Sequence, residues 1–167
     1  QMCIRDRLWC TFSHDQIDLN FKDPLVLIEF IEIVLLLLSK GVTTFRLDAV
    51  AFIWKKNGTS CVNLPETHEI VKLLRLIVNY INPHALIVTE TNLPRRENLS
   101  YFGNNDEANW IYNFPLPPLI LYTFLFEDSS KISGWSKSMP PAQINNSYLN
   151  FIASHDGIGM RPTEGLL

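Results

Sequence analysis

The sequence predicts an α/β protein built on parallel strands, and three observations indicate this fold class. Short apolar segments with strand composition alternate with longer segments whose apolar residues recur at helical spacing. Acidic residues lie near the ends of three of the four predicted strands: Asp48, Glu90 and Asp156. No glycine-rich phosphate turn follows any strand, which disfavours a dinucleotide-binding sheet. A barrel of parallel strands and an open two-sided sheet both fit this order of elements.

The first predicted helix covers residues 24–39 and follows a polar loop. Asp23 precedes Pro24, which is the pattern of an N-cap followed by proline at the first helical position. Gly41 ends the helix. Its apolar residues cover most of the circumference, so we expect the helix to be heavily buried. Residues 43–50 are β-branched and aromatic and form the first predicted strand.

The remaining elements follow from the same signals. Pro65 opens a second amphipathic helix over residues 65–81, and the Asn82-Pro83 pair ends it. Three more strands are predicted at residues 86–90, 110–114 and 149–154. Between them we expect a long polar loop at 92–107 with one helical turn, a helix at 116–127 and a short helix near 130–137.

The composition is that of a globular domain, with 167 residues, 47% hydrophobic and 19% charged. The net charge of −3 gives no reason to expect nucleic acid or an anionic membrane as a partner. The longest apolar run, residues 25–38, contains two glutamates and is too short to span a bilayer. Residues 1–8 lack periodicity and are interpreted as a non-native or disordered leader, which leaves 9–167 as the folded part.

The cysteines predict the compartment. Cys3, Cys10 and Cys61 have no metal-ligand spacing and make no even disulfide set. No signal peptide is recognised at the start of the chain. Free thiols in a reducing cytoplasm are therefore expected, with no metal site.

Arg46 and Asp48 are two residues apart on a predicted strand, so their side chains point to the same face. Arg46 is expected to hold Asp48 ionised and to fix its rotamer. A carboxylate held in this way suits nucleophilic attack on a sugar carbon. An ordinary ion pair at the end of a strand fits the same two residues.

The other candidates also have structural interpretations. Glu90 can be interpreted as a structural or solvated carboxylate. His155-Asp156 can be interpreted as a hydrogen-bonded pair that shapes the turn into Gly157. Three acids at the ends of parallel strands repel one another, however, and that arrangement usually marks function. The remaining histidines, His14, His68 and His84, are expected to be solvated.

Three motifs resemble the α-amylase family of glycoside hydrolases and transglycosidases. Residues 41–48 (GVTTFRLD) resemble its fourth-strand motif, residues 88–90 (VTE) its fifth and residues 154–156 (SHD) its seventh. Residues 58–61, 112–119 and 155–159 resemble the sucrose phosphorylase subfamily. The ending Glu90-Thr91-Asn92 is similar to relatives that act on glucosylglycerate or glucosylglycerol.

The resemblance implies a partial (β/α)8 barrel, from about strand 4 to strand 7, truncated at both ends. The third-strand motif Asp-x-x-x-Asn-His is absent, which agrees with this expectation. The resemblance also implies roles for individual residues. Asp48 would be the nucleophile, Glu90 the general acid/base, and Asp156 the residue that stabilises the transition state. Arg46 would orient Asp48, and His155 would bind the same sugar ring.

The implied function is a retaining glycoside phosphorylase that needs no cofactor. Its substrates would be a small α-glucoside, of the sucrose or glucosylglycerate type, and inorganic phosphate, with α-glucose 1-phosphate as product. The sequence itself offers Gly157 and Arg161 as phosphate contacts, because glycine leaves backbone N–H groups accessible and a guanidinium forms bidentate contacts. The alternatives are an α-glucosidase or amylase-type hydrolase and a non-catalytic, amylase-like binding subunit.

Overall fold

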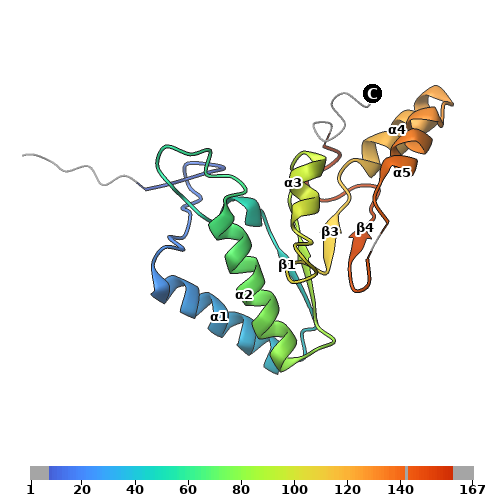
Figure 1. Cartoon of the computed structure of the whole chain (residues 1–167). Helices are drawn as coiled ribbons and strands as arrows, with labels where there is room; N and C mark the ends of the chain where they lie inside the picture. Colours follow the sequence, from blue (N-terminus) through green and yellow to red (C-terminus); the bar gives the residue numbers. More distant parts are fainter. Residues whose placement is uncertain (1–7, 142, 160–167) are drawn as a thin grey trace, which may run out of the picture.

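The computed structural model describes residues 8–141 and 143–159 (Figure 1). Their centre is a four-stranded parallel sheet of β1 (Thr44–Leu47), β2 (Leu86–Thr89), β3 (Trp110–Tyr112) and β4 (Ser147–Leu149). The longer helices are α1 (Pro24–Ser39), α2 (Pro65–Ile81), α4 (Leu116–Phe126) and α5 (Ser130–Ser138). Two short helices, η1 (Val50–Phe52) and α3 (Arg95–Ser100), follow β1 and β2.

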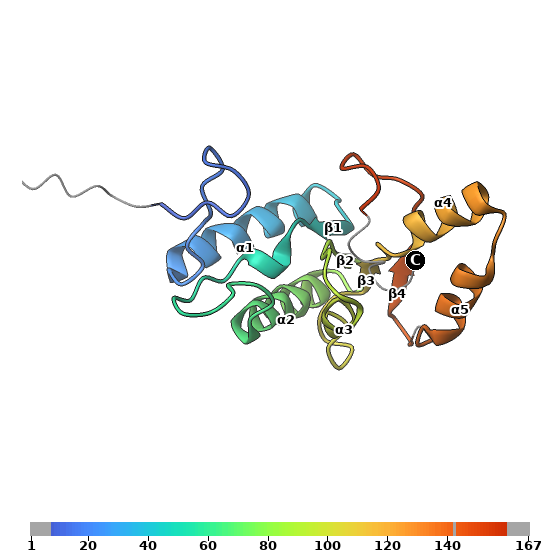
Figure 2. The same cartoon turned by 90° about the horizontal axis from the view of Figure 1, so that it is seen from above.

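The strand order decides between the two predicted architectures. Neighbours in the sheet follow the chain in the order β1-β2-β3-β4, with no reversal. Right-handed crossovers between strands in this order place the connecting helices on one face, whereas a two-sided sheet needs a reversal of direction. Seen from above, the strands form a curved row with α1 and α2 near β1 and α4 and α5 near β4 (Figure 2). This is the arrangement of a section of a barrel.

The two long N-terminal helices begin where the sequence predicts. The Asp23 carboxylate accepts a hydrogen bond from the N–H of Leu25 at 3.0 Å, and Pro24 occupies the first turn. Pro65 occupies the first turn of α2, which has no side-chain cap, and one stripe of this helix is buried, including Ile70, Val71 and Leu74. The stripe at helical spacing therefore faces the sheet, as an amphipathic helix requires.

The expected burial of α1 is wrong. Val34 is the buried residue of this helix, whereas Leu25 is 72% exposed and Leu36 is 57% exposed. The reason is that α1 packs on one side, against α2, so the rest of its apolar circumference faces outward.

In the part of the chain that the structure describes, no helix is both long and apolar enough to cross a membrane.

Strand β1 separates the core from the candidate site. Phe45 and Leu47 are buried and join the apolar core with α2, while Thr44 and Arg46 on the alternate positions are exposed. Because side chains alternate along a strand, Arg46 points to the face of the sheet opposite the helices.

The fourth strand is shorter and earlier than predicted. It was expected at residues 149–154, but its pairing with β3 ends at Tyr112 and Leu149. The last ladder bond is from the N–H of Asn113 to the carbonyl of Leu149, at 3.0 Å. Since β3 turns into α4 at this point, residues 150–154 have no partner strand on that side and form a loop.

The prediction for His68 is also wrong, because its side chain is only 16% exposed. The ring stacks on Tyr101, Nδ1 lies 2.7 Å from Glu107 Oε2, and Nε2 lies 3.1 Å from Asn63 Oδ1. The buried carboxylate of Glu107 needs such a partner. His14 and His84 are exposed, as predicted.

Gly103 lies close to Asp106 and Glu107 and leaves no room for a side chain. It has φ +55°, and a Cβ there would clash with the Asp106 carboxylate and lie 2.9 Å from Glu107 Cγ. Gly103→Ala should therefore lower the free energy of unfolding by about 1–3 kcal/mol. Urea denaturation measures this change. The matched control is Gly134→Ala in α5, where a Cβ meets no atom within 4 Å and alanine should be neutral or stabilising.

Candidate active site

Asp48 and Glu90 follow neighbouring strands directly. The register pairs Leu47 with Thr89, and the N–H of Glu90 donates to the carbonyl of Leu47 at 3.1 Å. Asp48 and Glu90 are thus the next pair of residues at the carboxyl ends of β1 and β2. Polar residues at these strand ends are where (β/α)8 barrels place their active sites.

Arg46 lies between the two carboxylates. Its Nη1 forms a close ion pair with Glu90 Oε2 and lies 3.8 Å from Asp48 Oδ1. The side chain of Glu90 is 7% exposed, whereas that of Asp48 is 72% exposed. Arg46 was expected to orient Asp48, but its shorter contact is with Glu90, because the buried carboxylate has the greater need of a partner.

The backbone turns sharply just after Asp48. Ala49 has φ 45° and ψ 32°, which is the left-handed region, and η1 starts at the next residue. A non-glycine residue in this region costs of order 1–2 kcal/mol, and such residues often lie at functional sites. The turn ends β1 abruptly and leaves the carboxylate of Asp48 exposed beside the sheet.

A pocket of about 540 Å³ opens beside Asp48. Its walls come from the segment before α1, from α1 and α2, and from the residues after β1; they include Phe12, Asp18, Phe21, Arg46, Asp48 and Leu74. The segment before α1 was predicted to be an ordinary polar loop, and its contribution to a pocket was missed.

An ion pair holds this segment against η1. Lys55 Nζ lies 2.5 Å from Asp18 Oδ2 and also bonds Thr11 and the carbonyl of Phe52. Burial raises the pKa of Asp18, but hydrogen bonds from Lys55 and Thr11 outweigh burial and place the pKa below its ordinary value. The pair therefore persists at neutral pH and ties the pocket wall to the turn after Asp48.

His155 and Asp156 lie in the loop after β4. All strands are parallel, so this loop leaves the same end of the sheet as Asp48 and Glu90, and Figure 1 shows it at that end. His155 Nε2 lies 3.5 Å from Asp156 Oδ1, and both side chains are about 70% exposed. Ser154 and Gly157 bridge across the turn. The structure thus brings Arg46, Asp48 and Glu90 together, and the ion pairs of the described residues do not join Asp156 to them.

Gly157 and Arg161 were predicted from the sequence to contact phosphate, and the structure describes only the first of them. Gly157 has φ +82°, and its N–H donates to the carbonyl of Ser154 at 3.0 Å, so it is not free to bind an anion as expected. The turn needs that bond to close. Arg161 lies outside the described residues.

Three aromatic rings at the same end of the sheet were not included among the predicted site residues. Tyr112 and Phe114 stack with their centroids 5.5 Å apart, and Phe151 lies edge-on to both at 5.4 and 5.5 Å. The motif at residues 112–119 drew attention to two of these rings, but only folding brings Phe151 to them.

Comparison with known proteins agrees with this geometry. Residues 7–157 match the family described as alpha amylase, catalytic domain. The chain is similar to glucosylglycerate phosphorylases from Allomeiothermus silvanus (52% identity over 161 residues) and Escherichia coli (47% over 161 residues), each covering 96% of this chain and 29% of the relative. The solved structure of sucrose 6F-phosphate phosphorylase from Thermoanaerobacter thermosaccharolyticum superposes with TM-score 0.78 and 28% identity, covering 95% of this chain and 32% of that one.

The parallel sheet with acidic residues at its carboxyl end therefore defines a section of a (β/α)8 barrel. The chain belongs to the alpha-amylase family, and its relatives confirm the predicted likeness to the sucrose phosphorylase group. It spans less than a third of the length of the curated relatives described above.

The ion pairs of Arg46 lead to a stability prediction. Arg46→Gln leaves the buried Glu90 carboxylate without its cation and should lower the free energy of unfolding by about 1–3 kcal/mol, less than for a fully buried pair because Arg46 is 38% exposed. Urea denaturation of a double-mutant cycle measures the coupling.

The double variant Arg46→Gln/Glu90→Gln should recover much of the loss, because no charge is then left buried. Equal losses in the single variant and the double variant would contradict the ion pair between Arg46 and Glu90.

Proposed function

We propose that the whole protein containing this chain is a retaining glycoside phosphorylase. It cleaves an α-glucoside with inorganic phosphate to give α-glucose 1-phosphate. The observation that carries the proposal is the pair of carboxylates on Asp48 and Glu90 with Arg46 between them. The similarity to glucosylglycerate phosphorylases supports the reaction type and points to glucosylglycerate as the substrate.

The spacing of the carboxylates supports retention. A shared nitrogen lies 3.8 Å from Asp48 Oδ1 and closer still to Glu90 Oε2. Both carboxylates contact this one nitrogen and therefore lie close together. A short separation of about 5–5.5 Å is typical of retaining enzymes, whereas inverting enzymes separate theirs by roughly 6.5–9.5 Å.

The first step transfers the glucosyl group to the protein. An oxygen of the exposed Asp48 carboxylate attacks the anomeric carbon and forms a covalent bond, while the bond to the leaving-group oxygen breaks. Glu90 in its acid form donates a proton to that oxygen, so the leaving group departs as a neutral hydroxyl. Arg46 contacts both carboxyl groups, so its positive charge is close to whichever of them is ionised at each step.

The second step reverses these roles. An oxygen of hydrogen phosphate attacks the anomeric carbon, and the Asp48 carboxylate leaves. Glu90, now ionised, accepts the proton that the phosphate gives up and returns to its acid form. Two inversions give the α configuration of the product.

Further residues complete the proposal. Asp156 and His155 would bind sugar hydroxyls from the loop after β4, and Arg161 would contact the phosphate. The proposed compartment is the cytoplasm, which is consistent with the free thiols of Cys10 and Cys61.

The roles of the two acids are tested by substitution in the whole protein. Asp48→Asn should reduce turnover by a factor on the order of 10⁴ or more, because an amide cannot attack the anomeric carbon. Glu90→Gln should reduce turnover of the natural glucoside by about 10²–10⁴ and affect α-glucosyl fluoride much less, since fluoride leaves without a proton. Initial rates measure both effects.

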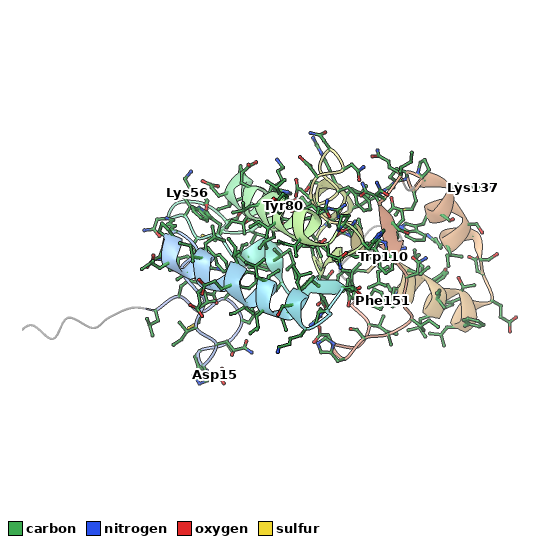
Figure 3. The ribbon with its side chains drawn as sticks, turned by 90° about the horizontal axis from the view of Figure 1, so that it is seen from below. Asp15, Lys56, Tyr80, Trp110, Lys137 and Phe151 are labelled. Carbon is green, nitrogen blue, oxygen red and sulfur yellow. The ribbon has the colours of Figure 1, made fainter. Side chains whose placement is uncertain are left out.

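The matched control is Asp15→Asn, at an exposed position on the segment before α1 that Figure 3 labels. It should leave the rate unchanged. An equal loss for both substrates in Glu90→Gln would contradict its role as an acid.

Phosphate dependence separates the candidate functions. The protein is incubated with glucosylglycerate, with and without phosphate, and α-glucose 1-phosphate and glucose are assayed. We expect α-glucose 1-phosphate that requires phosphate. Release of glucose at a rate indifferent to phosphate would instead identify a hydrolase, and binding without turnover would identify a binding subunit.

A further inference from the structure

Tyr112, Phe114 and Phe151 form a compact aromatic group at the carboxyl end of the sheet. All three rings contact one another and all are half-buried. Among the described residues, the apolar core beneath the sheet, which includes Phe45 and Ile111, does not contain them. In the section of the barrel that the chain spans, each ring therefore keeps part of its surface accessible.

The strand register places this aromatic group beside Glu90. Thr89 pairs with Ile111, so Glu90 and Tyr112 are the next pair along β2 and β3. Residues in register on neighbouring strands point to the same face and lie about 5 Å apart. Tyr112 is thus one strand beyond Glu90, on the side away from Asp48.

A buried hydrogen-bond chain reinforces this placement. The hydroxyl of Thr91, next to Glu90, donates to Asn98 Oδ1 at 2.6 Å. Asn98 Nδ2 in turn donates to the carbonyl of Tyr112 at 3.0 Å. Thr91 is 1% and Asn98 7% exposed, so the chain is shielded from water and fixes Tyr112 relative to the end of β2.

A second contact holds Phe151 in place. Asn113 Nδ2 donates to Asn150 Oδ1 at 2.8 Å and ties the loop after β4 to the end of β3. Figure 3 labels Phe151 on that loop, and its ring centroid lies 5.4 Å from that of Tyr112, the last residue of β3. The backbone at Tyr112 and the loop that carries Phe151 are therefore held by bonds that are independent of the stacking of the rings.

We propose that Tyr112, Phe114 and Phe151 form an aromatic platform that binds the leaving group of the glucoside and, in the reverse reaction, the acceptor. This rests on the proposed function in one respect, that Glu90 protonates the leaving-group oxygen. A group bonded to that oxygen extends past Glu90, away from Asp48, and meets the rings. The C–H surface of a polyol or sugar packs against aromatic faces, while its hydroxyls stay in water.

The test compares two substrates in the whole protein, 4-nitrophenyl α-glucoside and α-glucosyl fluoride. The nitrophenyl group is large enough to reach the platform, whereas fluoride is not. Phe114→Leu and Phe151→Leu should each lower kcat/KM for the nitrophenyl glucoside about 3- to 10-fold, the range of one aromatic contact, and leave the fluoride unchanged. Phe114→Tyr should retain activity on both.

The control variant is Phe102→Leu. Phe102 is also half-buried and pairs edge-on with Tyr148 at 5.6 Å, but it packs against the core. This variant should change the rates for both substrates equally or not at all. Thermal unfolding of every variant identifies a general loss of folding.

Both substrates report formation of the glucosyl-enzyme, so the test does not depend on whether phosphate or water completes the reaction. A phosphate-independent protein with the selective loss in Phe114→Leu would overturn the proposed function and support the platform. Equal losses for both substrates, or none, would overturn the platform.

If neither substrate is cleaved, saturation-transfer NMR with 4-nitrophenyl α-glucoside gives the answer. Transfer to the nitrophenyl protons that is lost in Phe114→Leu supports the platform, and transfer that is equal in the two proteins, or absent from both, overturns it.

Discussion

The contact between Arg46 and Glu90 is the interaction on which the candidate site depends. A carboxylate that is 7% exposed is unstable in the folded protein without a cation or hydrogen-bond donors. Arg46 supplies the cation from the neighbouring strand, and its guanidinium also reaches Asp48. One guanidinium therefore contacts both carboxyl groups and holds them close together. That closeness is what a double-displacement reaction at one carbon requires.

The sheet makes this contact possible through its register. Parallel pairing of β1, β2 and β3 aligns Asp48, Glu90 and Tyr112 at the carboxyl ends of the strands, with one residue at each end. Sequential strand order keeps the long helices to one face, so the opposite face of β1 is left for Arg46. Asp48 and Glu90, the proposed nucleophile and acid, and Tyr112 of the aromatic group thus occupy three consecutive positions of one row.

The departures from expectation share a physical cause. In each case a contact with a distant residue, or the point at which a neighbouring strand ends, outweighed the local sequence pattern. His68 is in the polar first turns of α2, yet Glu107 and Tyr101 enclose it. Residues 150–154 have strand composition, but β3 ends first and offers no partner. The N–H of Gly157 closes its own turn. The composition of a segment shows which secondary structures it permits, and the contacts with its neighbours decide which one forms.

The sequence by itself determined the fold class and the bounds of α1 and α2, and it indicated Arg46, Asp48 and Glu90 as candidate site residues. These follow from local rules: capping at Asp23, helical periodicity in α2, and alternation along β1. Only the tertiary structure decided that Arg46 pairs mainly with Glu90 and that Phe151 meets Tyr112 and Phe114. Those contacts join residues about 40 positions apart, and periodicity carries no information about which distant residue comes near. The register of the parallel strands carries that information, and it exists only once the chain has folded.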